Sequence, residues 1–229
     1  MKTKHLLLIC FLIILLLTLS FIPGPWQTID LNWGIIATIV VLLCLVILFL
    51  KFERHAYTAK EIALISMLAT ISAVLRIPFA AIPGVQPCTY LIICSGYVFG
   101  PIAGFMVGEM TPFVSNFFLG HGPWTPYQML AWGLIGIGSA YIRKIKPGVK
   151  SLIVIGLIYG FAYGIIMNIW FWASFIYPLT LTTFAFSMIN SIWFDTLHAV
   201  SNAVFLSIFG MKTISILERF KKRFHVEYI

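Results

Sequence analysis

Long apolar runs recur from one end of the sequence to the other. Eight of them fall at about 6–22, 34–50, 60–78, 86–99, 101–119, 126–142, 151–175 and 187–211. Most are about 17 residues or longer, close to the roughly 20 residues of a membrane-spanning helix and well above the roughly 10 of a membrane strand. They do not alternate between apolar and polar residues as barrel strands do. We therefore predict an all-α polytopic membrane protein.

Composition excludes several other classes of protein. The 229 residues are 61% hydrophobic and only 10% charged, whereas a soluble domain is about 25% charged. A soluble globular protein, a disordered chain and a disulfide-stapled secreted module are thereby excluded. The cysteines show no CxxC spacing and are interpreted as packing residues. Neither a nucleotide-binding P-loop nor a zinc-ligand spacing occurs, so we predict no metal site and no cofactor of its own.

The positive charge is placed as membrane topology requires. The formal net charge is +8, but all Lys and Arg except Arg76 flank apolar runs in four clusters. They are Lys2 and Lys4; Lys51, Arg54 and Lys60; Arg143, Lys144, Lys146 and Lys150; and Lys212, Arg219, Lys221, Lys222 and Arg223. The clusters occupy alternate connections, so the positive-inside rule predicts that both termini are cytoplasmic. We expect no nucleic-acid partner.

Few ionisable residues lie inside the apolar runs, and each is a functional candidate because burying a charge in a bilayer is costly. Glu109 lies near the middle of its run, and Arg76 lies at the outer end of the third run. Asp195 and His198 are one turn apart on one helical face. Arg76 is predicted either to form a buried ion pair with Glu109 or Asp195 or to contribute to a ligand site.

Polar and aromatic side chains gather at the outer ends of the last six runs. A small-molecule site needs an apolar, aromatic lining with a few hydrogen-bonding groups, which this set supplies, although an interfacial aromatic belt has the same composition. The further substrate-binding candidates are Gln86, Tyr90, Asn116, His121, Trp124, Tyr127, Asn168 and Trp172. The set suits a sizeable, mostly uncharged ligand that carries many amide-like groups.

Four features of the segment from about 58 to 211 resemble a known family. Two are sequence patterns in the core, the small residues of Ala69-Thr70-Ile71-Ser72-Ala73 and the turn Phe99-Gly100-Pro101-Ile102-Ala103-Gly104. The other two are the predicted orientation, with both termini on the cytoplasmic side, and the sequence GPWTPYQM at 122–129. The segment is similar to the six-helix S component, the substrate-binding membrane subunit of energy-coupling factor (ECF) transporters. The resemblance implies a six-helix core at 59–211, preceded by two extra helices in 1–58 and followed by a basic cytoplasmic tail at 212–229.

The resemblance also implies partners and a mechanism. The partners are a transmembrane scaffold subunit, contacted through Ala69 and Ala73, two separate ATPase subunits and the lipid bilayer of a prokaryotic plasma membrane. Substrate is expected to bind from outside, under the loops at 79–86 and around His121. The loaded subunit then topples against the scaffold to release substrate inside, and the chain itself is no enzyme.

The segment GPWTPYQM resembles S components assigned to cobalamin, so the transported ligand is expected to be cobalamin or cobinamide. Cobalt ligation by His121 or His198 is a lesser hypothesis. Three alternatives stay open. They are an S component for another vitamin such as riboflavin, an intramembrane enzyme that uses Glu109, Asp195 and His198 as acid and base, and a structural membrane subunit.

Overall fold

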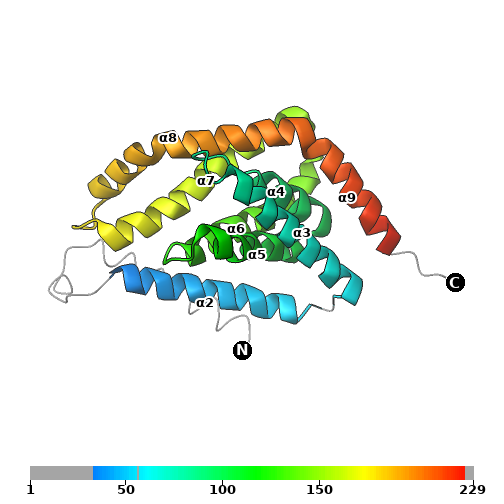
Figure 1. Cartoon of the computed structure of the whole chain (residues 1–229), viewed down its shortest axis with the longest axis horizontal. Helices are drawn as coiled ribbons and strands as arrows, with labels where there is room; N and C mark the ends of the chain where they lie inside the picture. Colours follow the sequence, from blue (N-terminus) through cyan, green and yellow to red (C-terminus); the bar gives the residue numbers. More distant parts are fainter. Residues whose placement is uncertain (1–32, 56, 225–229) are drawn as a thin grey trace.

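The computed structural model describes residues 33–55 and 57–224, and every regular element in them is helical (Figure 1). The α-helices are α2 (Trp33–Glu53), α3 (Ala59–Phe79), α4 (Cys88–Phe99), α5 (Pro101–Leu119), α6 (Thr125–Ile142), α7 (Val149–Phe175), α8 (Leu181–Phe205) and α9 (Met211–Phe224). A 3₁₀ turn, η2 (Arg143–Ile145), follows α6, and a π-helical turn, η3 (Leu206–Gly210), joins α8 to α9.

Five of the described helical segments are long and apolar enough to cross a membrane: α2, α3, α5, α7 and the continuous stretch Leu181–Arg223. The chain is thus an all-α, multi-pass membrane protein, as predicted. The apolar α4 is shorter, at 12 residues. The first predicted helix, at 6–22, lies outside the described residues.

Local sequence signals explain where the core helices begin. Thr58 caps α3, since its side chain accepts the Glu61 N–H while the Glu61 carboxylate accepts the Thr58 N–H, which together form a capping box. Between α4 and α5 the chain turns at Gly100, whose φ of 97° favours glycine, and Pro101 then starts α5. The tight turn predicted here is therefore present.

The last apolar run is longer than the predicted 187–211. Its helix begins at Leu181, behind a capping box between Thr180 and Thr183, and passes through η3 into α9. Lys and Arg end the apolar run but not the helix, because Ile214 and Leu217 are buried at helical spacing. Most of the segment predicted as a basic tail is thus helical.

The helices form a bundle with α8 and α2 on opposite sides (Figure 1). Helix α8 packs mainly on α7, whereas α2 lies against α5, α6 and α7. Between them, α4, α5 and α6 approach most closely at Gly136, where an added methyl group would overlap the backbone of Gly104. Small residues allow such backbone contacts between membrane helices. The centre of the bundle is therefore tightly packed.

Candidate functional site

A cavity of about 490 Å³ lies between α7, α8 and the loop that joins α3 to α4. This outer cavity is lined by Gly84, Gln86, Tyr163, Met167, Asn168, Trp170, Phe171, Ser187, Asn190, Ser191, Phe194, Asp195 and His198. Its volume falls within the roughly 300–1,000 Å³ of small-molecule sites, and its lining mixes aromatic and hydrogen-bonding groups. It lies at the helix ends that the charge pattern predicts to face outside.

A hydrogen-bonded network joins α7 to α8 across the floor of the outer cavity. The Asp195 carboxylate accepts hydrogen bonds from Ser191 Oγ at 2.7 Å and from Asn168 Nδ2 at 3.3 Å. Ser187 Oγ donates to Asn168 Oδ1 at 2.9 Å. Each of these side chains is thereby held in one orientation, as recognition of a polar ligand requires.

Glycines on α7 make room for this network. A methyl group at Gly160 would overlap the backbone of Ala199, and one at Gly164 would overlap the carboxylate of Asp195. The spacing of these glycines predicts close packing, and the structure places them on the face that meets α8. The carboxylate of Asp195 thus occupies the space that a larger residue at position 164 would fill.

His198 lies at the inner end of the outer cavity and is held by neutral partners. Its Nε2 lies 3.0 Å from Thr89 Oγ1 on α4, and Trp132 Nε1 donates to the same hydroxyl at 2.9 Å. The Tyr163 ring meets the histidine edge-on, with centroids 4.7 Å apart. As the sequence predicts, Asp195 and His198 share a buried face of α8.

The buried Arg76 of α3 lies behind Gln86 in the cavity wall. Its Nε donates to Gln86 Oε1 at 3.1 Å, and its Nη1 donates to Ser115 Oγ at 2.8 Å and Asn116 Oδ1 at 2.7 Å. The guanidinium carbon also lies 4.9 Å from the centroid of the Trp132 ring, a cation–π distance. Arg76 therefore fixes Gln86 in the wall.

The predicted ion pair of Arg76 with Glu109 or Asp195 does not form. The one ion pair among the described residues joins Arg143 to Glu218. Asp195 bonds instead to side chains of α7 and α8, and Oε2 of Glu109 has no hydrogen-bond partner in the described part of the chain. Neutral oxygens and an aromatic face surround the guanidinium, so its positive charge has no carboxylate counter-ion there.

The GPWTPYQM segment connects to the outer cavity through two sets of contacts. Asn116 Nδ2 donates to Thr125 Oγ1 at 3.0 Å and to Gln128 Oε1 at 2.9 Å. The side-chain Oδ1 of Asn116 accepts the hydrogen bond from Arg76. The Trp124 ring lies 6.0 Å from Trp170, which lines the cavity. The segment thus supports the wall without lining it.

Tyr127, in the same segment, is buried against the extra helix α2. Its hydroxyl lies 3.3 Å from Thr38 Oγ1, and its ring centroid lies 6.4 Å from that of Trp170. On α2, Ala37, Val41 and Leu45 form the buried stripe. Helix α2 therefore packs as part of the bundle and braces the support of the cavity wall.

The predicted substrate-binding residues divide into three groups. Gln86, Asn168, Asp195 and His198 line the outer cavity, and Arg76, Asn116, Trp124 and Tyr127 lie behind its lining. Outside both groups are Tyr90, which stacks on Phe205; His121, which packs on Phe117; Trp172, which donates to Thr183; and Glu109. Four of the predicted residues thus line the outer cavity, and four more lie directly behind its lining.

The alanines predicted to contact a scaffold subunit point into the chain itself. Ala69 and Ala73 are only 3% and 1% exposed, and α3 packs closely on α5. The exposed face of α3 carries Ser66 and Thr70 instead. An AxxxA spacing places two small residues on one face of a helix. The same spacing serves contact with a helix of the same chain and contact with a partner subunit.

Most of the aromatic residues and some of the polar residues that line the outer cavity are not among the predicted site residues. Helical spacing could have found both, because the missed residues continue a face at steps of three or four. On α7 they are Tyr163, Met167 and Trp170, and on α8 they are Ser187 and Ser191, which lead to Asp195. No group of three or more His, Cys, Asp or Glu that could hold a metal ion occurs in the described ranges.

Comparison with known proteins gives one match. The family model of the ECF transporter substrate-specific component matches residues 60–216, well over half of the chain. The match includes α3 to α8 and thus all the residues that line the outer cavity. No curated protein and no solved structure gives a significant match.

Proposed function

Since the chain belongs to the family of ECF transporter substrate-specific components, we propose that it binds a corrinoid, cobalamin or cobinamide, in the outer cavity for uptake. The ligand enters from outside, between α7, α8 and the α3–α4 loop. A scaffold subunit and two ATPase subunits supply the work of transport, and ATP hydrolysis belongs to those subunits. The chain resides in a prokaryotic plasma membrane with both termini cytoplasmic.

The main support for this proposal is a chain of hydrogen bonds that joins the GPWTPYQM segment to the cavity wall. Asn116 bonds both to this segment and to Arg76, which in turn holds Gln86 at the cavity. A segment that resembles S components assigned to cobalamin therefore supports the wall that a ligand would touch. The lining adds amide and hydroxyl groups, which suit the amide-fringed rim of a corrin.

Trp170 supports the same assignment. Its indole N–H is buried without a hydrogen-bond partner among the described residues, although its ring lines the outer cavity. The ring therefore offers a ligand an apolar aromatic surface, on which a corrin ring can stack.

Cavity size favours a second candidate. At about 490 Å³ the outer cavity matches a drug-sized ligand, such as riboflavin or a related heterocycle. A whole corrinoid is larger, so its binding requires the α3–α4 loop to move away from α8. That loop touches α8 at Gly84, beside Leu197 and Phe194, and at Gln86, whose N–H donates to Ser201 Oγ at 3.3 Å.

Calorimetric titration of the purified chain separates these ligands. Cyanocobalamin, cobinamide and riboflavin are titrated in parallel into the wild type and into Asn168→Leu, which removes the amide at the centre of the polar network. We expect saturable binding of a corrinoid that weakens on the order of tenfold or more in the variant, because several hydrogen bonds lose a partner. Binding of riboflavin alone would replace the corrinoid assignment.

Coupling to the scaffold is assigned to the exposed face of α3. Because Ala69 and Ala73 are buried, we place the contact on Ser66 and Thr70, whose small side chains allow a close approach. Ser66→Leu with Thr70→Leu is expected to stop uptake in the complete transporter while ligand binding by the isolated chain persists. Uptake at the wild-type rate would move the contact elsewhere.

A further inference from the structure

Helix α9 leaves the membrane core at its cytoplasmic surface. Helix α8 has 25 residues, about 37 Å at 1.5 Å per residue, which already crosses a hydrocarbon core of roughly 30 Å. The chain then passes through the π-helical turn η3, and α9 runs in a different direction (Figure 1). Helix α9 therefore lies at the level of the lipid headgroups on the predicted cytoplasmic side.

The surface of α9 has the pattern of an interfacial helix. Ile214 and Leu217 face inward, while Ile216 and Phe220 are 45% and 41% exposed on another flank. The exposed basic residues lie between these two faces and are Lys212, Arg219, Lys222 and Arg223. An apolar stripe next to basic side chains is typical of helices that lie in the headgroup region.

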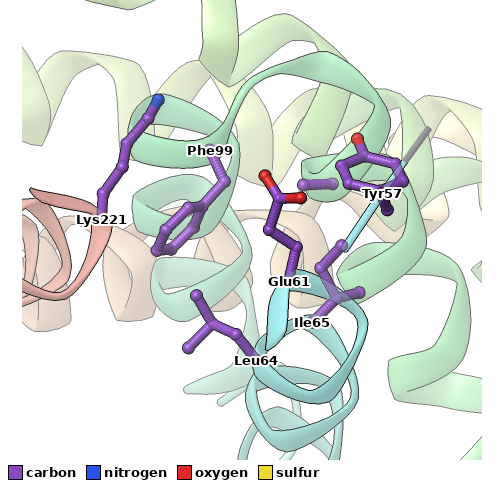
Figure 2. A pocket seen from close by; sticks show the side chains of 7 residues that line it. Tyr57, Glu61, Leu64, Ile65, Phe99 and Lys221 are labelled. Carbon is purple, nitrogen blue, oxygen red and sulfur yellow. The ribbon is translucent and has the colours of Figure 1, made fainter. Parts of the chain in front are cut away.

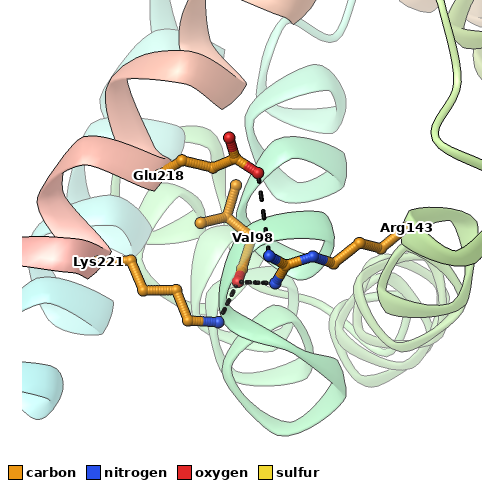
Figure 3. A network of polar contacts seen from close by, with 4 residues as sticks. All are labelled: Val98, Arg143, Glu218 and Lys221. Carbon is orange, nitrogen blue, oxygen red and sulfur yellow. Dashed lines mark hydrogen bonds and ion pairs between the residues drawn. The ribbon is translucent and has the colours of Figure 1, made fainter. Parts of the chain in front are cut away.

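Two cations are held in place where α9 meets the end of α4. The Val98 carbonyl accepts a hydrogen bond from Lys221 Nζ at 2.6 Å and one from Arg143 Nη1 at 3.4 Å (Figure 3). The Lys221 side chain reaches this point past Phe99, opposite the side chains of α3 (Figure 2). Carbonyls at a helix C-terminus carry partial negative charge, which favours cations there.

Beside these contacts lies an open hollow of about 530 Å³, lined by Arg143, Glu218, Lys221 and Lys222. This cytoplasmic hollow combines three cations with one carboxylate, which leaves a formal surplus of two positive charges. Glu218 lies 4.0 Å from Arg143 Nη2 and orients the guanidinium. Several N–H groups of Arg143 and Lys222 remain available to an anion.

We propose that the cytoplasmic hollow binds the phosphate of an anionic phospholipid headgroup. Basic pockets between helices on the cytoplasmic side attract such headgroups, at a depth where a lipid phosphate is always present. The apolar flank of α9, with Ile216 and Phe220, keeps the hollow at that depth. The inference stands independently of which vitamin the outer cavity holds.

The test measures stabilisation of the full chain by lipid. The detergent-purified protein is titrated with phosphatidylglycerol, phosphatidylcholine or inorganic phosphate while its thermal unfolding midpoint is recorded. The test variant is Arg143→Gln with Lys222→Gln. The matched control, Lys51→Gln with Lys150→Gln, removes two exposed cations that do not line the hollow.

We expect phosphatidylglycerol to raise the midpoint of the wild type and the control alike. In the test variant its apparent affinity should fall on the order of tenfold, because each basic residue near the surface contributes separately. Lys222 makes no hydrogen bond or ion pair within the described ranges, so Lys222→Gln alone keeps the fold and should show part of the loss.

Four results would overturn the proposal. Equal phosphatidylglycerol affinity in the test and control variants would place lipid binding elsewhere, and an equal response to phosphatidylcholine would remove the role of charge. A midpoint shift with inorganic phosphate alone would make the hollow a site for free phosphate. Unchanged lipid binding with lost uptake in the complete transporter would instead make it a contact for an acidic surface of a partner subunit.

Discussion

The pairs α5–α6 and α7–α8 are built alike and end differently. Each consists of neighbouring helices packed through glycines, Gly104 on Gly136 in the first pair and Gly160 on Ala199 in the second. In the first pair the outer ends stay closed, since Asn116 bonds directly to Gln128. In the second pair, side-chain bonds also join the outer ends, Asn168 to Ser187 and Trp172 to Thr183, but here the two helices line the outer cavity together with the α3–α4 loop.

The difference shows what glycines and polar residues each determine. Glycines bring two helix backbones together wherever they face a neighbour. Above Gly164, the same face of α7 carries Asn168 and Trp172, whose larger side chains reach across to α8 and bond to Ser187 and Thr183. A binding cavity thus arises where a stripe of small residues gives way to larger polar ones.

Replacing the glycine at the closed pair should have the largest effect. In Gly136→Leu the new side chain would overlap the backbone of Gly104, and neither backbone can move without unpacking α4 as well. We expect a loss of stability of about 3 kcal/mol or more, above the usual range for overpacking. Thermal unfolding in detergent measures it, with Ser66→Ala, on the exposed face of α3, as the unchanged control.

Gly164→Ala should lower ligand affinity while leaving the packing of the helices intact. The new methyl group would overlap only the end of the Asp195 side chain, which can rotate away, so the helix packing survives. Ligand affinity should fall on the order of tenfold, because the carboxylate loses its bonds to α7 and α8. The matched Gly160→Ala meets the Ala199 backbone and should lower the unfolding midpoint further, and the reverse order would contradict this comparison.

Asp195→Asn keeps the shape of the side chain and removes its charge. Hydrogen bonds to charged groups are stronger than neutral ones by about 1 kcal/mol, so we expect ligand affinity to fall about fivefold with little change in stability. Glu109→Gln is the control, since Glu109 does not line the outer cavity. An equal loss of affinity in both variants would indicate that the ligand lies elsewhere.

The smallest effect is expected for Ser187→Ala, which removes one neutral hydrogen bond to Asn168. The free energy of ligand binding should change by about 1 kcal/mol or less, so affinity should fall no more than about fivefold in the same titration. Ser66→Ala, on the exposed face of α3, should leave affinity unchanged. A larger effect for Ser187→Ala than for Asp195→Asn would make the serine, rather than the carboxylate, the principal contact.

Much of the architecture could be predicted from the sequence. Apolar runs bounded by Gly, Pro and capping residues locate most helices, and helical spacing places Asp195 and His198 on one buried face. The prediction is wrong at the last run, because the basic residues there indicate the end of a helix, whereas the helix continues with Ile214 and Leu217 buried.

The exact site could not be predicted, because it depends on how each helix is rotated and tilted. Tyr90 and Gln86 are four residues apart and look equally suitable, yet Tyr90 stacks on Phe205 while Gln86 lines the cavity. The predicted ion pair of Arg76 with Glu109 or Asp195 does not form, for the same reason. Contacts between helices distant in sequence decide which polar groups Arg76 meets.

The outer cavity is proposed to open to the outside and to hold the ligand. Asn190→Cys places a thiol in its lining, and intact cells are treated with a membrane-impermeant maleimide with and without cyanocobalamin, the unsubstituted chain serving as background. We predict that the thiol is labelled and that cyanocobalamin protects it, whereas Ser151→Cys, on the predicted cytoplasmic side, is labelled only after lysis. Labelling of Asn190→Cys that cyanocobalamin does not slow, or that also requires lysis, would contradict the claim.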